Sequence, residues 1–183
     1  MSETGSAHHI HVREAAAADM PALFSIRTSV RENHLDLVKL AERGVTPASV
    51  AAMLDATDQR VWVAEDGNVI VALSMADART GTVFAVFVHP SAEGRGFGRA
   101  VLRVAEDWLF EAGWEKIQLQ TDEAPHTRAH RFYQAAGWEL AGPADHGDVR
   151  YEKHRAVSND SLASSSPPLG GTMTPGAPES QEV

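Results

Sequence analysis

The sequence predicts a mixed α/β domain in which a mostly antiparallel central sheet is flanked by about four helices. Three observations predict it. Alternating or wholly apolar short runs mark strands in both halves of the chain, and apolar residues at helical spacing mark helices between them. A turn signal at Asp66-Gly67-Asn68 joins two neighbouring strands as a hairpin. A strand, a helix and another strand follow, which is the order of a β-α-β unit.

The first part of the chain carries one strand and two helices. Residues 10–15 alternate between apolar and polar side chains, as a half-buried strand does. Apolar side chains at helical spacing over 20–30 indicate a helix with Asp19 as its N-cap. A loop or irregular helix continues to Gly44. Thr46-Pro47 then starts a short helix, because a capping hydroxyl precedes a proline whose missing N–H costs nothing there.

The later elements surround one very apolar strand. Residues 82–88 are almost wholly apolar, as expected of a central strand covered on both faces, and His89-Pro90 ends it. The clearest helix covers 99–112 and ends at Gly113. The remaining predicted elements are strands at 60–65, 69–76, 116–121, 138–141 and 148–153 and a helix at 127–136.

Composition and charge exclude several classes of protein. The 183 residues contain no cysteine, which excludes a disulfide scaffold, a zinc ribbon, an iron–sulfur site and a thiol nucleophile. The 16 Lys+Arg against 25 Asp+Glu give a net charge of −9, which argues against a general nucleic-acid binder. No apolar run reaches the roughly 18 residues of a membrane span, and no secretory signal is visible. We therefore expect a cytoplasmic protein with no nucleic-acid or membrane partner.

The domain organisation follows from an uneven composition. Residues 156–183 contain 6 Ser, 4 Pro and 3 Gly and no aromatic residue. Such a segment cannot bury enough apolar surface to offset the entropy lost on ordering, so it is predicted to be a disordered tail. Residues 1–9 are predicted to be a flexible N-terminus. One folded domain over 10–155 remains.

A glycine-rich loop follows the central strand. Gly94, Gly96 and Gly98 let successive backbone N–H groups converge at a helix start, where the helix dipole is positive. This arrangement favours a phosphate or pyrophosphate, and Arg95 and Arg99 add positive charge. Neither the Walker loop nor the dinucleotide fingerprint matches, because no Lys-Ser or Lys-Thr is present here and the third glycine is missing. The alternative is a tight turn that binds nothing.

Two motifs resemble a known family. The run from Val86 to Pro90, followed by residues 93–98, resembles the acetyl-CoA-binding motif Q/R-x-x-G-x-G/A of the GNAT superfamily of N-acetyltransferases, with Glu93 departing from it. Residues 127–138 resemble that family's late helix, N-x-x-A-x-x-F-Y-x-x-x-G-F. There, His126 stands where Asn is common and Trp138 where Phe is common.

The resemblance implies a GNAT-like single-domain fold with a splayed β-α-β unit. It implies an acetyl-CoA-dependent N-acetyltransferase that moves acetyl directly from the thioester to a primary amine of a small molecule, peptide or protein. Acetyl-CoA would be the cosubstrate, with no metal. The strand backbone would pair with the pantetheine arm, and loop N–H groups would hold the pyrophosphate. The implied cofactor-binding residues are Val86, Phe87, Val88, Gly94, Arg95, Gly96, Phe97, Gly98, Arg99 and His126.

The candidate catalytic residues are Tyr133, which the resemblance implies, and Glu32, which is a candidate base in the sequence. Tyr133 matches the family's general acid, which protonates the departing thiolate; the alternative is a core tyrosine on an apolar helix face. A base must remove a proton from the ammonium form of the acceptor. Glu32 is one candidate, and His34, Asp122, Glu123 or a water chain are the others.

A second function stays open beside the enzyme. A non-catalytic acyl-CoA-binding or sensing module would keep the glycine loop and need neither acid nor base. For the enzyme, the partner is an amine-bearing acceptor, and the resemblance implies a homodimer as one oligomeric option. The loop over 31–45 and the helix that starts at Thr46 would shape the acceptor pocket by the same resemblance.

Overall fold

The computed structural model of the protein describes residues 10–31, 35–122 and 127–156. Seven strands form one sheet in the order β1-β2-β3-β4-β5-β7-β6. All neighbours run antiparallel except β4 and β5. The strands are β1 His11–Glu14, β2 Gln59–Asp66, β3 Val69–Asp77, β4 Thr82–Val88, β5 Lys116–Asp122, β6 Glu139–Pro143 and β7 Asp148–His154.

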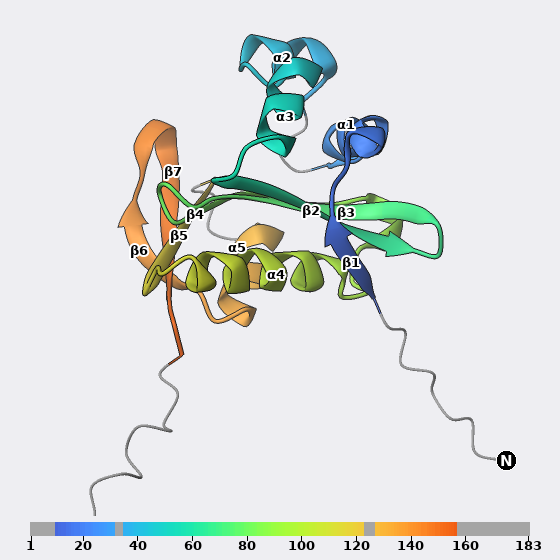
Figure 1. The fold of residues 1–183 in the computed structure, drawn as a ribbon. Coiled ribbons are helices and arrows are strands. Elements are labelled where there is room, and N and C mark those ends of the chain that lie inside the picture. Colours follow the sequence, from blue (N-terminus) through green and yellow to red (C-terminus); the bar gives the residue numbers. More distant parts are fainter. Residues whose placement is uncertain (1–9, 32–34, 123–126, 157–183) are drawn as a thin grey trace, which may run out of the picture.

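Helices cover both faces of the sheet (Figure 1). On one face lie α1 Met20–Ser29, α2 Leu37–Glu42 and α3 Pro47–Leu54, and on the other α4 Phe97–Glu111 and α5 Arg128–Ala135. Short 3-10 turns precede α1, follow β4 and precede β7, at Ala17–Asp19, Pro90–Ala92 and Asp145–Gly147. The predicted mixed α/β class with a mostly antiparallel sheet is confirmed.

The described residues contain five α-helices, one more than the sequence predicted. The additional helix, α2, lies in the segment that was expected to be a loop or irregular helix. It has only 6 residues and one buried side chain, Leu40, so it is too short to show an apolar period. The Asp36 carboxylate starts it by accepting a hydrogen bond from the Lys39 N–H at 2.9 Å.

The two predicted helix starts have different outcomes. The Thr46 hydroxyl caps α3 as predicted, because it accepts a hydrogen bond from the Ser49 N–H at 3.1 Å. Asp19 does not cap α1. Its carboxylate accepts from the Ala16 N–H at 2.7 Å in the preceding 3-10 turn and from the Arg13 guanidinium at 2.7 and 3.0 Å. The hydrogen bond from Arg13 holds the pKa of Asp19 below its usual range.

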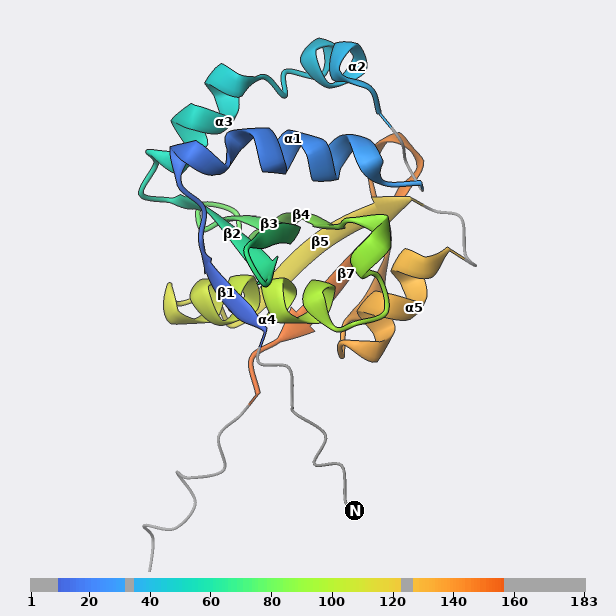
Figure 2. The same ribbon diagram turned by 90° about the vertical axis from the view of Figure 1, so that its right-hand side faces the viewer.

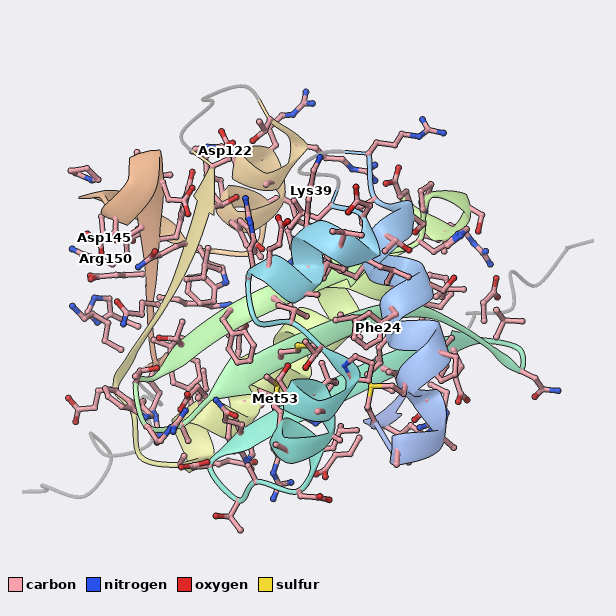
Figure 3. All side chains as sticks on the ribbon, turned by 90° about the horizontal axis from the view of Figure 1, so that it is seen from above. Phe24, Lys39, Met53, Asp122, Asp145 and Arg150 are labelled. Atoms are coloured by element: carbon pink, nitrogen blue, oxygen red, sulfur yellow. The ribbon has the colours of Figure 1, made fainter. Side chains whose placement is uncertain are left out.

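The parallel neighbours β4 and β5 meet at one end. Thr82 and Gln118 are the pair in register between them, and the strands draw apart from there toward the end of β5 at Asp122 (Figure 3). The Gln118 N–H donates to the Gly81 carbonyl at 2.9 Å, which pins the closed end. The ring of Trp114 packs against Gly81 so closely that a Cβ there would lie 2.6 Å from it. The predicted splay of the β-α-β unit is therefore present.

The core has two halves, one on each side of the sheet. The half under α4 and α5 includes Trp62, whose ring meets the Trp108 ring edge-on at 5.5 Å between centroids. The other half packs under α1 and α3, around Leu23, Ile26, Val50, Val61, Val63 and Leu73. No helix in the described part of the chain has the length and apolar character to cross a bilayer. The predicted flexible N-terminus and residues 157–183 of the predicted tail lie outside the described residues.

Candidate functional site

The open edge of β4 is the first part of the candidate site. Beyond Thr82, β4 has no paired strand on its β5 side among the described residues. On its other side, Ala85 pairs with Met75 and Val83 with Ala76, so Phe84 is an extra residue that forms a β-bulge. Val86, Phe87 and Val88, predicted to bind the pantetheine arm, continue this edge toward the glycine loop.

The glycine loop leads directly into α4. Gly94 and Gly96 have φ of +74° and +91°, which favours glycine at both positions. Gly96 is the N-cap of the 15-residue helix α4, and the Ala100 N–H bonds to its carbonyl at 3.0 Å. The N–H groups of the first three helical residues, Phe97 to Arg99, therefore lack an acceptor within the helix. Together with the positive end of the helix dipole they make an anion-binding position.

Gly98 has a packing role. A Cβ on it would lie 3.0 Å from Val88 Cγ2 and 3.5 Å from the Phe132 ring, so the first turn of α4 lies directly against β4 and α5. The neighbouring Phe97 side chain is buried in the core. Of the predicted cofactor-binding residues, Phe97 and Gly98 can thus offer only backbone groups to a ligand.

Both arginines predicted to add positive charge have partners within the protein. The Arg95 guanidinium donates to the Asp66 carboxylate at 2.6 and 3.1 Å, and this contact raises the pKa of Arg95. Arg95 also lies over the Phe97 ring, 5.2 Å from its centroid. The Arg99 guanidinium donates to the Ala135 carbonyl at the end of α5. The site therefore receives much less free positive charge from these side chains than their sequence positions predicted.

A third arginine, Arg128, was missed by sequence reasoning. It is the first residue of α5, and its guanidinium forms an ion pair with Glu93 at the start of the glycine loop. Glu93 is the residue that departs from the family's motif, where Gln or Arg is usual. The signal that could have indicated this ion pair is the carboxylate of Glu93 at a motif position where Gln or Arg is usual.

His130 ties α5 to two strands. Its Nε2 lies 2.8 Å from the carbonyl oxygen of Asp122 at the end of β5, and its Nδ1 lies 2.8 Å from the Tyr151 hydroxyl of β7. A carbonyl only accepts, so Nε2 carries a proton, and in the neutral imidazole Nδ1 accepts from the hydroxyl. Sequence reasoning did not single out His130, which helps to set the position of the helix that carries Tyr133.

Tyr133 lies in the core beneath the sheet. Its ring meets that of Phe132 at 5.1 Å and that of Tyr151 at 6.0 Å between centroids. Burial raises the pKa of Tyr133 to about 12. Within the described ranges, no residue forms a hydrogen bond with its hydroxyl. The packing agrees with the core alternative considered above.

Of the four candidate base side chains, only Asp122 is described. Glu32, His34 and Glu123, and the predicted cofactor contact His126, lie outside the described residues. Asp122 is exposed at the end of β5 and lies opposite Asp148 of β7 in register. Because Ile117 and Leu119 are buried against α4, the alternating polar residues Gln118, Gln120 and Asp122 face the side of α1–α3.

Similarity to solved structures supports this fold. The PaiA N-acetyltransferase from Thermoplasma acidophilum, solved in complex with coenzyme A, has a TM-score of 0.69 at 13% identity, over 80% of this chain and 99% of that one. The ribosomal-protein-S18-alanine N-acetyltransferase from Escherichia coli has a TM-score of 0.62 at 15% identity, over 84% and 99%.

A curated relative shares part of the sequence. A mycothiol acetyltransferase from Beutenbergia cavernae is 35% identical over 83 residues, which are 43% of this chain and 28% of that protein. The match thus spans about a quarter of the length of the relative.

Fold and site together define a mixed α/β protein in which two parallel strands diverge and a glycine loop leads from one of them to a helix start. Within that class, the model of the acetyltransferase (GNAT) family matches residues 26–138. The chain belongs to the GNAT acetyltransferase family, as the two motifs had implied.

Proposed function

We propose that this chain is an acetyl-CoA-dependent N-acetyltransferase that transfers acetyl directly to a primary amine of a small molecule, peptide or protein. The proposal rests on one observation: the unpaired edge of β4 leads through the glycine loop to the free N–H groups at the start of α4. Membership of the GNAT family supports acetyl transfer, and the amine acceptor is our inference.

The residues present fit the cosubstrate. An unpaired strand edge offers alternating N–H and carbonyl groups, which match the amides of a pantetheine arm at Val86, Phe87 and Val88. The N–H groups of Phe97, Gly98 and Arg99 fit the pyrophosphate. Gly94 and Gly96, both at positive φ, carry no side chain, so the backbone at these two loop positions is open to a ligand. Bound acetyl-CoA would supply an acetyl group activated as a thioester.

The proposed chemistry needs two groups from the chain, besides a base. The acceptor nitrogen attacks the carbonyl carbon, the C–N bond forms and the C–S bond breaks. A backbone N–H of β4 near Val88 stabilises negative charge on the carbonyl oxygen. Tyr133 donates its phenolic proton to the departing sulfur, and the proton lost by the amine returns to the phenolate through solvent. The chain has no cysteine, so no cysteine acyl-enzyme takes part.

Asp122 is the base candidate that the described residues support. It lies at the end of β5 where the two strands are furthest apart, and Asp148 is its partner across the ladder. Two carboxylates directly opposite each other repel, and a cationic acceptor nearby would reduce that repulsion. An alkyl ammonium, with a pKa near 10.4 before binding, suits that position. Water remains the alternative to Asp122, as do Glu32, His34 and Glu123.

The deciding experiment measures binding and turnover separately. Calorimetry with acetyl-CoA and CoA tests the cradle, and thiol release with an amine panel tests transfer. The panel includes mycothiol-related amines and a peptide with an N-terminal alanine, the two acceptor types in the names of the similar proteins. Binding together with amine-dependent thiol release is expected, and a protein that binds neither ligand would refute the proposal.

A non-catalytic acyl-CoA-binding module is the second candidate. The observation that favours it is the deep burial of Tyr133, which serves the core equally well without catalysis. Binding of acetyl-CoA without turnover on any amine would select this candidate.

We also propose, from the sequence, that the folded unit covers residues 10–155, between a flexible N-terminus and a disordered tail. A cytoplasmic location, the absence of nucleic-acid and membrane partners and a homodimer are proposals of the same kind. Light scattering of the purified chain tests the dimer.

A further inference from the structure

We propose that Arg99 is a positioning residue that couples the cofactor-binding start of α4 to α5, the helix that carries Tyr133. The inference rests on the proposed function, because it takes Tyr133 to be the general acid. It replaces the prediction that the Arg99 side chain binds phosphate. The backbone N–H of Arg99 keeps its place in the cradle, and the side chain gains a different role.

Arg99 joins two helix ends. It is the third residue of α4, and its guanidinium extends to the last residue of α5, where it donates to the Ala135 carbonyl. Figure 2 shows α4 and α5 on the same face of the sheet. Carbonyls in the last turn of a helix accept no hydrogen bond from within the helix. A cation there also interacts favourably with the negative end of the helix dipole. Arg99 therefore caps α5 from the start of α4.

Tyr133 is held by the same turn of α5. Its carbonyl accepts hydrogen bonds from the N–H groups of Ala136 and Trp138, both at 3.0 Å. Ala135, the acceptor of Arg99, lies between Tyr133 and these two donors in the chain. A change in the last turn at Ala135 therefore moves the backbone of Tyr133 directly.

A second cation, Lys153, binds the next carbonyl along the chain, that of Ala136. Lys153 of β7 donates to the Ala136 carbonyl at 2.9 Å and to the Glu106 carboxylate at 2.6 Å. Glu106 is buried and also accepts from Trp138 Nε1 at 2.6 Å. Lys153 thus anchors the turn to the core, whereas Arg99 anchors it to the helix start that a pyrophosphate would contact. Of these two cations, Arg99 is the one that can carry an effect of cofactor binding to Tyr133.

The two roles of Arg99 predict different kinetics. A side chain that binds phosphate stabilises bound acetyl-CoA, so its loss raises the Kd for acetyl-CoA and lowers the salt dependence of binding. A positioning residue acts in the transfer step, so its loss lowers kcat while the Kd stays the same. The two effects are separable in one variant.

The test compares Arg99→Gln with Arg103→Gln. Both substitutions remove one positive charge, and both residues line the same groove of about 640 Å³ along α4, but Arg103 has no hydrogen-bond or ion-pair partner among the described residues. We expect Arg99→Gln to lower kcat by about tenfold with a Kd for acetyl-CoA within about twofold of the parent. Arg99→Lys, which keeps a donor and a charge, should recover part of kcat, and Arg103→Gln should leave both quantities unchanged.

Hydrogen exchange gives a readout that needs no cofactor. The amides at the C-terminal end of α5 should exchange faster in Arg99→Gln than in the parent and in Arg103→Gln. A raised Kd with unchanged kcat and unchanged exchange would return Arg99 to the phosphate site, and unchanged values of all three would remove it from both roles. If Arg99→Gln fails to fold, Arg99→Lys is compared in the same way. A parent protein that neither binds acetyl-CoA nor releases thiol defeats the proposed function, whereas exchange still decides whether Arg99 holds α5.

Discussion

Arg95 of the glycine loop donates to the carboxylate of Asp66, the last residue of β2, at 2.6 and 3.1 Å. The pair lies beside the start of α4. The Asp66 carboxylate there repels an anionic ligand and also binds the Arg95 guanidinium, which could otherwise attract that ligand. We predict that Asp66→Asn lowers the Kd for CoA by about two- to fivefold, a small effect because the ion pair is exposed. Calorimetry at low and high salt measures it, and the gain should shrink as salt screens the site.

The matched control for that prediction is Arg95→Gln. This change removes the cation instead of its partner, so CoA binding should weaken. Equal Kd values for the parent and both variants would show that Arg95 does not contribute to the phosphate site.

Gly96→Ala should separate fold stability from ligand binding when it is compared with Gly113→Ala. Both glycines lie at the ends of α4 with positive φ, +91° and +103°. Alanine should cost each variant roughly 1–2 kcal/mol of unfolding free energy because of backbone strain. Only Gly96 belongs to the cradle, so only Gly96→Ala should also weaken CoA binding. Denaturant unfolding and calorimetry together test the prediction, and an equal loss of affinity in both variants would contradict it.

Tyr133→Phe should affect the reaction more than the fold. The hydroxyl has no hydrogen-bond partner among the described residues, so its removal should leave the free energy of unfolding nearly unchanged. Loss of a general acid should lower kcat by about 100-fold with the Kd for acetyl-CoA unchanged. Single-turnover kinetics and calorimetry measure the two effects. An unchanged kcat would assign Tyr133 to the core alone.

Tyr151→Phe is the contrasting variant. It removes the hydroxyl that pairs with His130 Nδ1 in the core, so it should cost about 1–3 kcal/mol of unfolding free energy. We therefore expect the two tyrosines to show opposite patterns: Tyr133 affects the rate of transfer, and Tyr151 affects stability.

The pH dependence of the reaction follows from the buried phenol. Burial raises the pKa of Tyr133 to about 12, so the phenol stays protonated, the form that a general acid needs, at every lower pH. The value of kcat/KM should rise with pH as the acceptor amine loses its proton, with no fall due to Tyr133 up to about pH 10. A pH–rate profile with a descending limb near pH 10 that disappears in Tyr133→Phe would show that the phenol ionises at its ordinary pKa.

The backbone of the site was predictable because its signals are local. The glycine loop was expected to lead into a helix at residue 99, and the structure begins α4 two residues earlier, at Phe97, with Gly96 as its N-cap at positive φ. His89-Pro90 was expected to end the central strand, and β4 ends at Val88. In each case, conformational preferences of a few neighbouring residues decide the outcome. The glycine cradle is therefore the part of the candidate site that sequence reasoning described best.

Side-chain partners were not predictable because they depend on tertiary contacts. Arg95 finds its partner 29 residues away and Arg99 finds its partner 36 residues away along the chain. Both arginines were assigned to phosphate by their charge and position alone. Asp19 likewise had a more stable alternative to capping α1, because Arg13 lies close enough to bind its carboxylate with two hydrogen bonds. The short helix α2 was missed for another reason, since one buried leucine in six residues leaves no periodic pattern.

The single register pair between β4 and β5 gives the sheet an edge in its interior. Exposed strand edges usually allow another chain to add a strand, and proteins protect the outer ones for that reason. Here the unpaired edge faces β5, which closes on it at Thr82 and Gln118. An extended ligand arm that enters from the open end would supply the missing hydrogen bonds between the two parts of the sheet. Such a ligand would therefore act as an eighth strand, and unfolding of the complex would have to break the sheet and the ligand contacts together.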